Sequence, residues 1–191
     1  MATTSTDRHE TDEHLTGEAA VAKARQLLPG FRTAMLVTKA DEGAGLHMRP
    51  MALQGDLSVF GGTLWFFTDD RAPKVREVQR HSTVSLVFQD EEASRYLQLN
   101  GTATFVTDRG KMRELFTADT RTWFPDGVDD PHLTLLRIDV TGGAFWERPG
   151  GVLQSMAAFT KSVVTGTRGD SGRAGTIDLE VPADVYQGDQ G

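Results

Sequence analysis

The stretch LHMRPMALQGDLSVFGGTLWFFTDDRAPK, residues 46–74, decides the fold more than any other part of the chain. Its two apolar runs, residues 46–55 and 61–70, have the mixture of apolar, aromatic and β-branched residues that is typical of strands. Pro50 lies inside the first run and has no backbone N–H to donate. This strand must therefore lie at a sheet edge, contain a bulge, or place Pro50 where the sheet needs no donor.

The same stretch carries positive charge at two points of an acidic chain. Arg49 lies in the first run and Lys74 follows the second, while Thr68 offers a hydroxyl between them. One interpretation is a solvated hairpin whose charges face water. The other is a pocket for a phosphate-bearing cofactor, because a phosphate needs fixed cations and hydroxyl donors. Such patterns often arise by chance, so spacing alone favours the first interpretation.

Further strands and short helices are predicted on both sides of this stretch. Helices are expected at residues 17–28, 72–81, 109–124 and 152–164, and strands at residues 31–40, 82–90, 95–108, 132–140 and 142–151. The last residues offer one more short extended piece. Most connections between consecutive strands are too short for parallel crossovers. We therefore expect an antiparallel sheet that closes as a barrel or a sandwich.

Length and composition bound the class of protein. A chain of 191 residues suits one domain, and we expect a disordered tail at residues 1–16, a core domain at 17–165, and a flexible linker and tail at 166–191. The net charge of −7, from 20 basic and 27 acidic residues, argues against a nucleic-acid-binding protein. Because the chain has no cysteine, disulfides and thiolate zinc sites are excluded, and no metal site is predicted.

The sequence contains no apolar run that approaches the length of a membrane span. Its first residues have neither the basic region nor the apolar core of a secretory signal. We therefore expect a cytoplasmic protein with no membrane partner.

A flavin mononucleotide (FMN) site needs three kinds of group. Arg49, Thr68 and Lys74 could hold the phosphate, and the backbone of residues 50–53 could meet the edge of the ring. Aromatic side chains could cover the faces of the ring; the candidates are Trp65, Phe67, Trp123 and Trp146. The alternative is that the cations are surface charges and the tryptophans belong to the core.

Four segments follow one another in an order that is more specific than any one of them: HMRPMAL, LWFFTDDRAPKVREV, YLQLNGTATFVTD and FPDGVDDPHLTLLRIDVTGGAFWE. Over roughly residues 17–165 the chain resembles the pyridoxamine-phosphate-oxidase-like split-barrel flavoproteins, especially their bacterial general stress protein branch. The resemblance implies a mainly β fold, a six-stranded antiparallel split β-barrel with short helices. It also implies a homodimer that holds one FMN in each of two interface clefts.

The resemblance assigns cofactor-binding roles to particular residues of this chain. Arg49 matches the arginine that opens the flavin-binding strand, and that strand continues through Pro50, Met51, Ala52, Leu53 and Gln54. Phe67 and Thr68 match an aromatic–hydroxyl pair, and Lys74 matches a phosphate-binding lysine at a helix start. Tyr96 falls where the oxidases commonly have a glutamine, and Trp146 matches a tryptophan near the flavin at the dimer interface.

Asn100-Gly101 is by itself the strongest short-range signal for a hairpin. The resemblance instead places this pair inside a long bent strand. A glycine suits such a bend because it relieves crowding. We therefore expect one continuous strand through Gly101.

The chain departs from the true oxidases after Trp146. The oxidases carry an arginine and a histidine there that grip substrate and flavin, whereas ERPGGVLQSMAAF has no basic residue between Arg148 and Lys161. We therefore expect an FMN-dependent oxidoreductase of general stress protein type, which exchanges hydride or electrons with a small-molecule donor or acceptor and does not oxidise vitamin B6.

No side chain is identified as catalytic, and His47 and Tyr96 are the nearest titratable candidates. Two alternatives stay open. One is a flavin-binding or flavin-storing protein without turnover, and the other is a related split barrel that holds a deazaflavin or haem.

Overall fold

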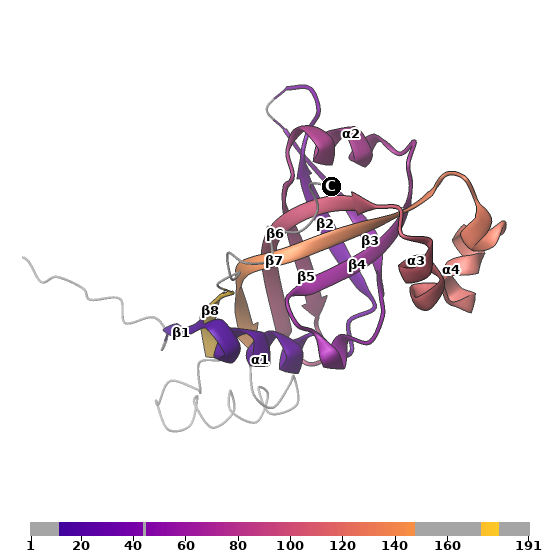
Figure 1. Cartoon of the computed structure of the whole chain (residues 1–191). Coiled ribbons are helices and arrows are strands. Elements are labelled where there is room, and N and C mark those ends of the chain that lie inside the picture. Colours follow the sequence, from indigo (N-terminus) through magenta and orange to yellow (C-terminus); the bar gives the residue numbers. More distant parts are fainter. Residues whose placement is uncertain (1–11, 44, 148–172, 180–191) are drawn as a thin grey trace, which may run out of the picture.

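The computed structural model describes residues 12–43, 45–147 and 173–179, which form one eight-stranded sheet with short helices around it (Figure 1). The strands are β1 (Asp12–Thr16), β2 (Thr33–Lys39), β3 (Leu46–Gln54), β4 (Thr63–Asp69), β5 (Thr83–Asp90), β6 (Arg95–Val106), β7 (Leu133–Glu147) and β8 (Arg173–Asp178). The helices are α1 (Gly17–Leu27), α2 (Pro73–Arg80), α3 (Arg109–Leu115) and α4 (Ala118–Trp123), with short 3₁₀ turns η1 (Leu57–Val59) and η2 (Gly127–Asp129).

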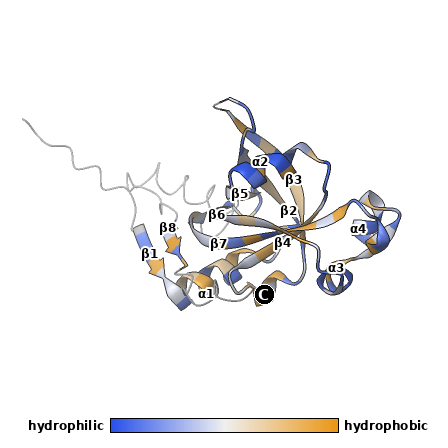
Figure 2. Ribbon diagram, turned by 45° about the horizontal axis from the view of Figure 1, so that its top comes forward, coloured by the Kyte–Doolittle hydropathy of each residue, from blue (hydrophilic) through white to orange (hydrophobic). Residues whose placement is uncertain are grey.

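Six of the strands close into an antiparallel barrel. The pairing runs β2–β3–β4–β7–β6–β5 and returns from β5 to β2. Residues alternate between the interior and the outer surface, as on β2, and Figure 2 shows hydropathy changing along the strands. Phe66, Phe88 and Phe145 fill the interior. The predicted six-stranded barrel with short helices is confirmed.

A helix lies at each end of the barrel in Figure 1. Helix α2 lies at the upper end, near the ends of β2 and β3, and α1 lies at the lower end. Helix α1 places Ala20, Ala24 and Leu27 in the core, since these residues recur at helical spacing. The α3–α4 pair lies to one side. None of the helices in the described residues is long and apolar enough to cross a membrane.

The barrel opens between β3 and β4. Only Leu53 and Gln54 of β3 pair with β4, opposite Phe66 and Trp65, whereas residues 46–52 of β3 pair with β2 alone. Pro50 lies in this part, where one side of the strand needs no ladder donors. The unpaired edge at Pro50 is one of the three arrangements that this proline predicted. It leaves a gap in the hydrogen-bonded ladder between β3 and β4.

Strands β6 and β7 form the longest ladder, and both bend at glycines. The register shifts between Asn100 and Gly101, so that Thr141 of β7 is left without a direct partner. A side chain at Gly101 would collide with the carbonyl oxygen of Asp139. The prediction of one continuous strand through Gly101 is confirmed, but the two strands predicted at residues 132–140 and 142–151 are one strand, because the glycines at 142 and 143 allow a close ladder without ending it.

Each segment predicted as a tail contains a strand. Residues 12–16 form β1 inside the predicted N-terminal tail, and β8 begins in the predicted linker and overlaps the short extended piece that was predicted after it. The two strands pair in parallel, and β8 continues the sheet along β7. Polar sequences can join a sheet in this way because backbone groups supply the ladder, and Ala174 and Ile177 still bury their side chains.

Two other helical predictions have different outcomes. The helix predicted at 109–124 is two helices, since Phe116 ends α3 and the Thr117–Thr120 capping box begins α4. The helix predicted at residues 152–164 lies outside the described residues.

We predict that Gly101→Ala destabilises the protein by about 1–3 kcal/mol, because the new methyl group must displace backbone of β7. Thermal or urea unfolding monitored by circular dichroism measures this loss. Gly61→Ala is the matched control, since an added Cβ there meets no atom within 4 Å. Equal effects of the two substitutions would contradict the packing argument.

Candidate functional site

The gap between β3 and β4 is bordered by two cations and a hydroxyl. Lys74 Nζ donates a hydrogen bond to Thr68 Oγ1 at 2.8 Å, which joins the start of α2 to the end of β4. Helix α2 is anchored by its buried Val75 and Val78, and Pro73 suits its first turn. Arg49 of β3 lies close enough for its charge to lower the pKa of Lys74. Three residues that the sequence placed together are thus close in the structure.

A buried carboxylate organises the Arg49 side of the gap. The Glu77 side chain is 2% exposed, and its Oε2 accepts hydrogen bonds from Arg49 Nη2 at 2.7 Å and from Thr38 Oγ1 at 2.6 Å. Its Oε1 lies 2.5 Å from Nδ1 of His47. Arg49 also donates from Nη1 to Thr38 Oγ1 at 2.5 Å. We call these four residues of β2, β3 and α2 the Glu77 network.

The electrostatics of the network and of Lys74 differ. Burial raises the pKa of Glu77, but the hydrogen bonds from Thr38, His47 and Arg49 outweigh it and hold this pKa below its ordinary value. For Lys74, burial is the largest effect and the charge of Arg49 adds to it, so the pKa of the ammonium group is lowered. The site therefore holds positive charge that its own surroundings do not fully neutralise.

The side chains of residues 50–54 on β3 point to different sides of the barrel. Met51 points into the core and is 6% exposed, while Pro50 and Ala52 are exposed on the outside of the barrel. Gln54 links this strand to α4: its Nε2 donates to the carbonyl of Ala52, and its Oε1 accepts from Thr120 Oγ1 at 3.1 Å. Leu53 is half-buried against the core. The exposed edge of the strand offers backbone groups to the gap.

Phe67 does not lie beside the cations. It is 7% exposed and belongs to a second apolar cluster between β4 and α3, where it packs against Phe116 at 5.7 Å and Phe124 at 6.5 Å between ring centroids. Its side chain contributes to the packing of α3 and α4 against β4. Its backbone, next to Thr68, is the part that borders the gap.

The four aromatic candidates for covering a ring have different environments. Trp65 is half-buried with Lys111 and Arg137 over its ring. Trp123 on α4 is 77% exposed. Of the four, Trp123 and Trp146 therefore present large exposed surfaces, while Trp65 and Phe67 are used in packing.

Tyr96 and Trp146 face each other across β6 and β7, with exposed fractions of 40% and 45%. Both point to the outside of the barrel. Thr68 pairs with Thr134, near the start of β7, whereas Trp146 lies near the end of this strand. Neither of them is among the described hydrogen-bond partners of Arg49, Thr68 and Lys74, which we call the cation site.

Two functional-looking residues were missed by sequence reasoning. Glu77 and Thr38 are ordinary polar residues in the sequence, yet both are buried and hydrogen-bonded to Arg49. The signal for Glu77 was its place next to Val78 on the inward face of α2, one turn after Lys74. In the described part of the chain, no group of three or more metal-binding side chains is assembled.

Known proteins resemble this chain in sequence and in structure. A solved structure named for general stress protein 26 from Jannaschia sp. CCS1 is 25% identical, with a TM-score of 0.69 over 83% of this chain and 97% of that one. The general stress FMN/FAD binding protein of Xanthomonas citri is 27% identical, with a TM-score of 0.58 over 67% of this chain and 88% of that one.

Protein bli-3 of Neurospora crassa is 24% identical over 141 residues, which are 69% of this chain and 66% of that protein, just under two thirds of its length. The family model described as pyridoxamine 5'-phosphate oxidase like matches residues 19–170, which include every strand of the barrel and the whole cation site. This chain therefore belongs to the pyridoxamine 5'-phosphate oxidase-like family.

Proposed function

We propose that the protein binds FMN at the gap between β3 and β4, with Lys74, Thr68 and Arg49 around the phosphate. The observation that carries the proposal is the juxtaposition of two cations from α2 and β3 beside the Thr68 hydroxyl. A phosphate near Lys74 would offset the burial and the repulsion from Arg49 that lower the pKa of its ammonium group. The name of the Xanthomonas citri relative supports a flavin as the ligand.

The residues present fit the two ends of FMN differently. Charge-assisted donors suit the phosphate, and the start of α2 adds backbone N–H groups to them. The edge of β3 at Pro50 to Ala52 could meet the polar edge of the ring. A bound flavin would supply hydride or electron transfer, while the protein supplies binding and electrostatics.

We further propose that the protein is a homodimer. Apolar side chains gather on the outer surface of β2, β3 and β5–β7: Met35, Val37, Met48, Val87, Tyr96 and Trp146. We call them the outer apolar face. An exposed apolar surface of this kind is typical of an interface. In such a dimer, as the family resemblance implies, Trp146 of one copy would lie near the flavin at the interface.

The activity that we propose is oxidoreduction with a small-molecule donor or acceptor in the cytoplasm. The rival candidate is a flavin holder without turnover, and it is favoured because the titratable side chains described at the gap, Glu77 and His47, are hydrogen-bonded to each other. An absorption spectrum of the purified protein identifies the cofactor, since FMN, deazaflavin and haem absorb differently. Anaerobic mixing with NADH or NADPH then separates an enzyme, which bleaches the flavin band, from a holder, which does not.

We predict that Lys74→Met weakens FMN binding about tenfold to a hundredfold, because one charge-assisted hydrogen bond of about 1.5–3 kcal/mol is lost. Riboflavin lacks the phosphate and should bind almost as before. The free energy of unfolding of the cofactor-free protein should not fall, since the pKa of Lys74 shows that its charge is disfavoured there. Flavin fluorescence quenching and urea unfolding measure these quantities.

Lys39→Ala is the control for this substitution, because Lys39 is an exposed lysine at the end of β2. It should leave both flavin affinities unchanged. Equal losses of FMN and riboflavin affinity in Lys74→Met would show that Lys74 does not hold the phosphate.

We predict a mass of twice 20.9 kDa by light scattering at micromolar concentration. Val87→Glu should shift the protein toward the monomer, because it places a charge on the outer apolar face. Val59→Glu is the matched control, since Val59 is 72% exposed in η1, away from that face. A wild-type mass of one chain would exclude the proposed dimer.

We predict no efficient oxidation of pyridoxamine or pyridoxine phosphate by the FMN-loaded protein. Residues 149–160 contain no cation for a substrate phosphate, and an unpaired dianion is costly to bury. This segment lies outside the described residues, so the prediction rests on the sequence. Release of pyridoxal phosphate and peroxide at about one turnover per second or faster would contradict it.

A further inference from the structure

His47 lies at the solvent side of the Glu77 network, and its contact with Glu77 fixes its tautomer. An ionised carboxylate only accepts hydrogen bonds, so Nδ1 of His47 must carry the hydrogen that it shares with Glu77 Oε1 at 2.5 Å. A second proton on the ring can therefore go only to Nε2. The His47 side chain is 56% exposed, so water can deliver that proton.

The charges of the site balance only with that proton. Arg49 and Lys74 carry one positive charge each, and Glu77 carries one negative charge. A phosphate monoester is close to a dianion above its second pKa of about 6. Its arrival would leave the half-buried site with a net negative charge, and a charged His47 would restore neutrality. Because unbalanced charge is costly in such a place, the dianion favours the protonated imidazole.

Charged groups near His47 come from α2 and β3. Helix α2 contributes Glu77 and Lys74, β3 contributes Arg49, and β2 contributes only the neutral Thr38. The neighbouring charges form pairs of their own: Asp69 of β4 with Arg71, and Asp41 with Arg76 and Arg80 of α2. Among the described residues, His47 is the one histidine bound to the network.

We propose that His47 is part of the phosphate site and takes up a proton at Nε2 when a phosphate monoester dianion binds at Arg49 and Lys74. This inference rests on the proposed FMN binding and adds that the binding is linked to pH. Since the bound state holds more protons than the unbound state, FMN affinity falls as pH rises through the range in which His47 loses its proton. Riboflavin, which has no phosphate, binds without this uptake.

The test is calorimetric titration of the cofactor-free protein with FMN at about pH 7.4, where the ligand is already mostly a dianion. Titrations in two buffers with different heats of protonation give the number of protons taken up. We expect a measurable uptake of protons for FMN, because the bound dianion favours the protonated imidazole. We expect none for riboflavin, and FMN affinity should fall about threefold to tenfold between pH 6.5 and pH 8.5.

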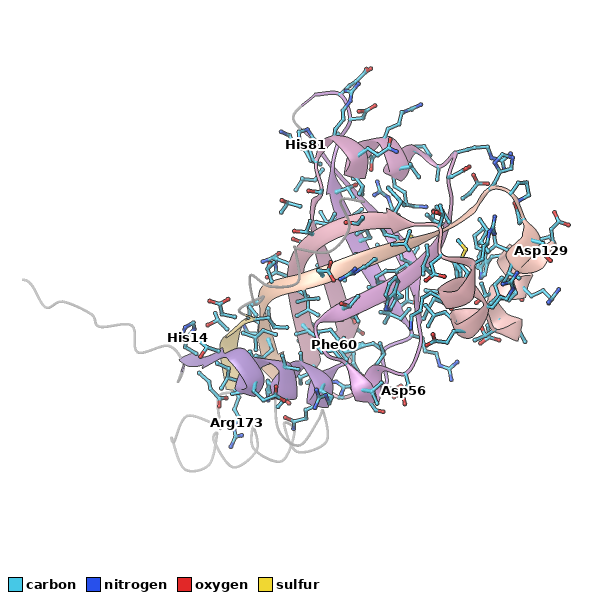
Figure 3. All side chains as sticks on the ribbon, viewed as in Figure 1. His14, Asp56, Phe60, His81, Asp129 and Arg173 are labelled. Carbon is cyan, nitrogen blue, oxygen red and sulfur yellow. The ribbon has the colours of Figure 1, made fainter. Side chains whose placement is uncertain are left out.

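Two substitutions at His47 separate charge from structure. His47→Gln still offers an N–H to Glu77 but cannot titrate, so proton uptake should vanish and FMN affinity should lose most of its pH dependence. His47→Lys carries a permanent charge, so uptake should also vanish, while affinity at pH 8.5 should match or exceed that of the wild type. His14→Gln is the control, because His14 lies at β1, far from α2 (Figure 3).

The outcomes are distinct. Undiminished proton uptake in His47→Gln, or equal uptake for FMN and riboflavin, would overturn the inference and leave the proposed FMN binding intact. Failure of the wild-type protein to bind FMN at all would overturn the proposed function and this inference together. Loss of uptake in His47→Gln with normal uptake in His14→Gln supports the assignment.

Discussion

The buried carboxylate of Glu77 is the interaction on which this end of the barrel depends. It joins α2 to β2 through Thr38 and to β3 through Arg49 and His47. An isolated ionised carboxylate in this position would be very unfavourable, and the three hydrogen bonds that it accepts from Thr38, His47 and Arg49 are what make its burial tolerable. The same contacts hold α2 against β2 and β3, and Lys74 lies about one turn before Glu77 on this helix.

A second constraint is the incomplete pairing of β3. A strand that pairs fully on both sides offers no backbone to a ligand, whereas β3 pairs with β4 only at Leu53 and Gln54. Pro50 makes this economical, because it removes a donor that full pairing would need. On the opposite side of the barrel the long β6–β7 ladder is continuous, and glycines allow it to bend. The β6–β7 ladder therefore closes the barrel, whereas the partly paired β3 leaves backbone groups free for a ligand.

Much of this organisation could be predicted from sequence, for reasons that are visible in particular residues. Runs of apolar and β-branched residues identified β2, β5 and β6. Spacing alone favoured surface charges for Arg49, Thr68 and Lys74, and it was the family resemblance that assigned them to one site. Local patterns could not reveal Glu77 or Thr38, because burial of a polar residue depends on partners from distant strands. They also could not show that Phe67 packs in the second apolar cluster, since an aromatic residue at a strand end suits a core and a ligand ring equally well.

Strands β1 and β8 pair with each other, yet both lie outside residues 19–170, the part of the chain that the family model matches. The folded unit is therefore longer than the matched part. Cutting the chain to the family-matching residues 19–170 would remove both strands. The half of β7 from Gly142 to Glu147 would then lose the neighbour that covers one of its edges, and Phe145 would lose its contact with Gly175. Bare strand edges recruit other chains. A fragment limited to the family-matching residues would therefore be prone to aggregate. In the full chain, β8 covers the edge of β7, and β1 covers the edge of β8.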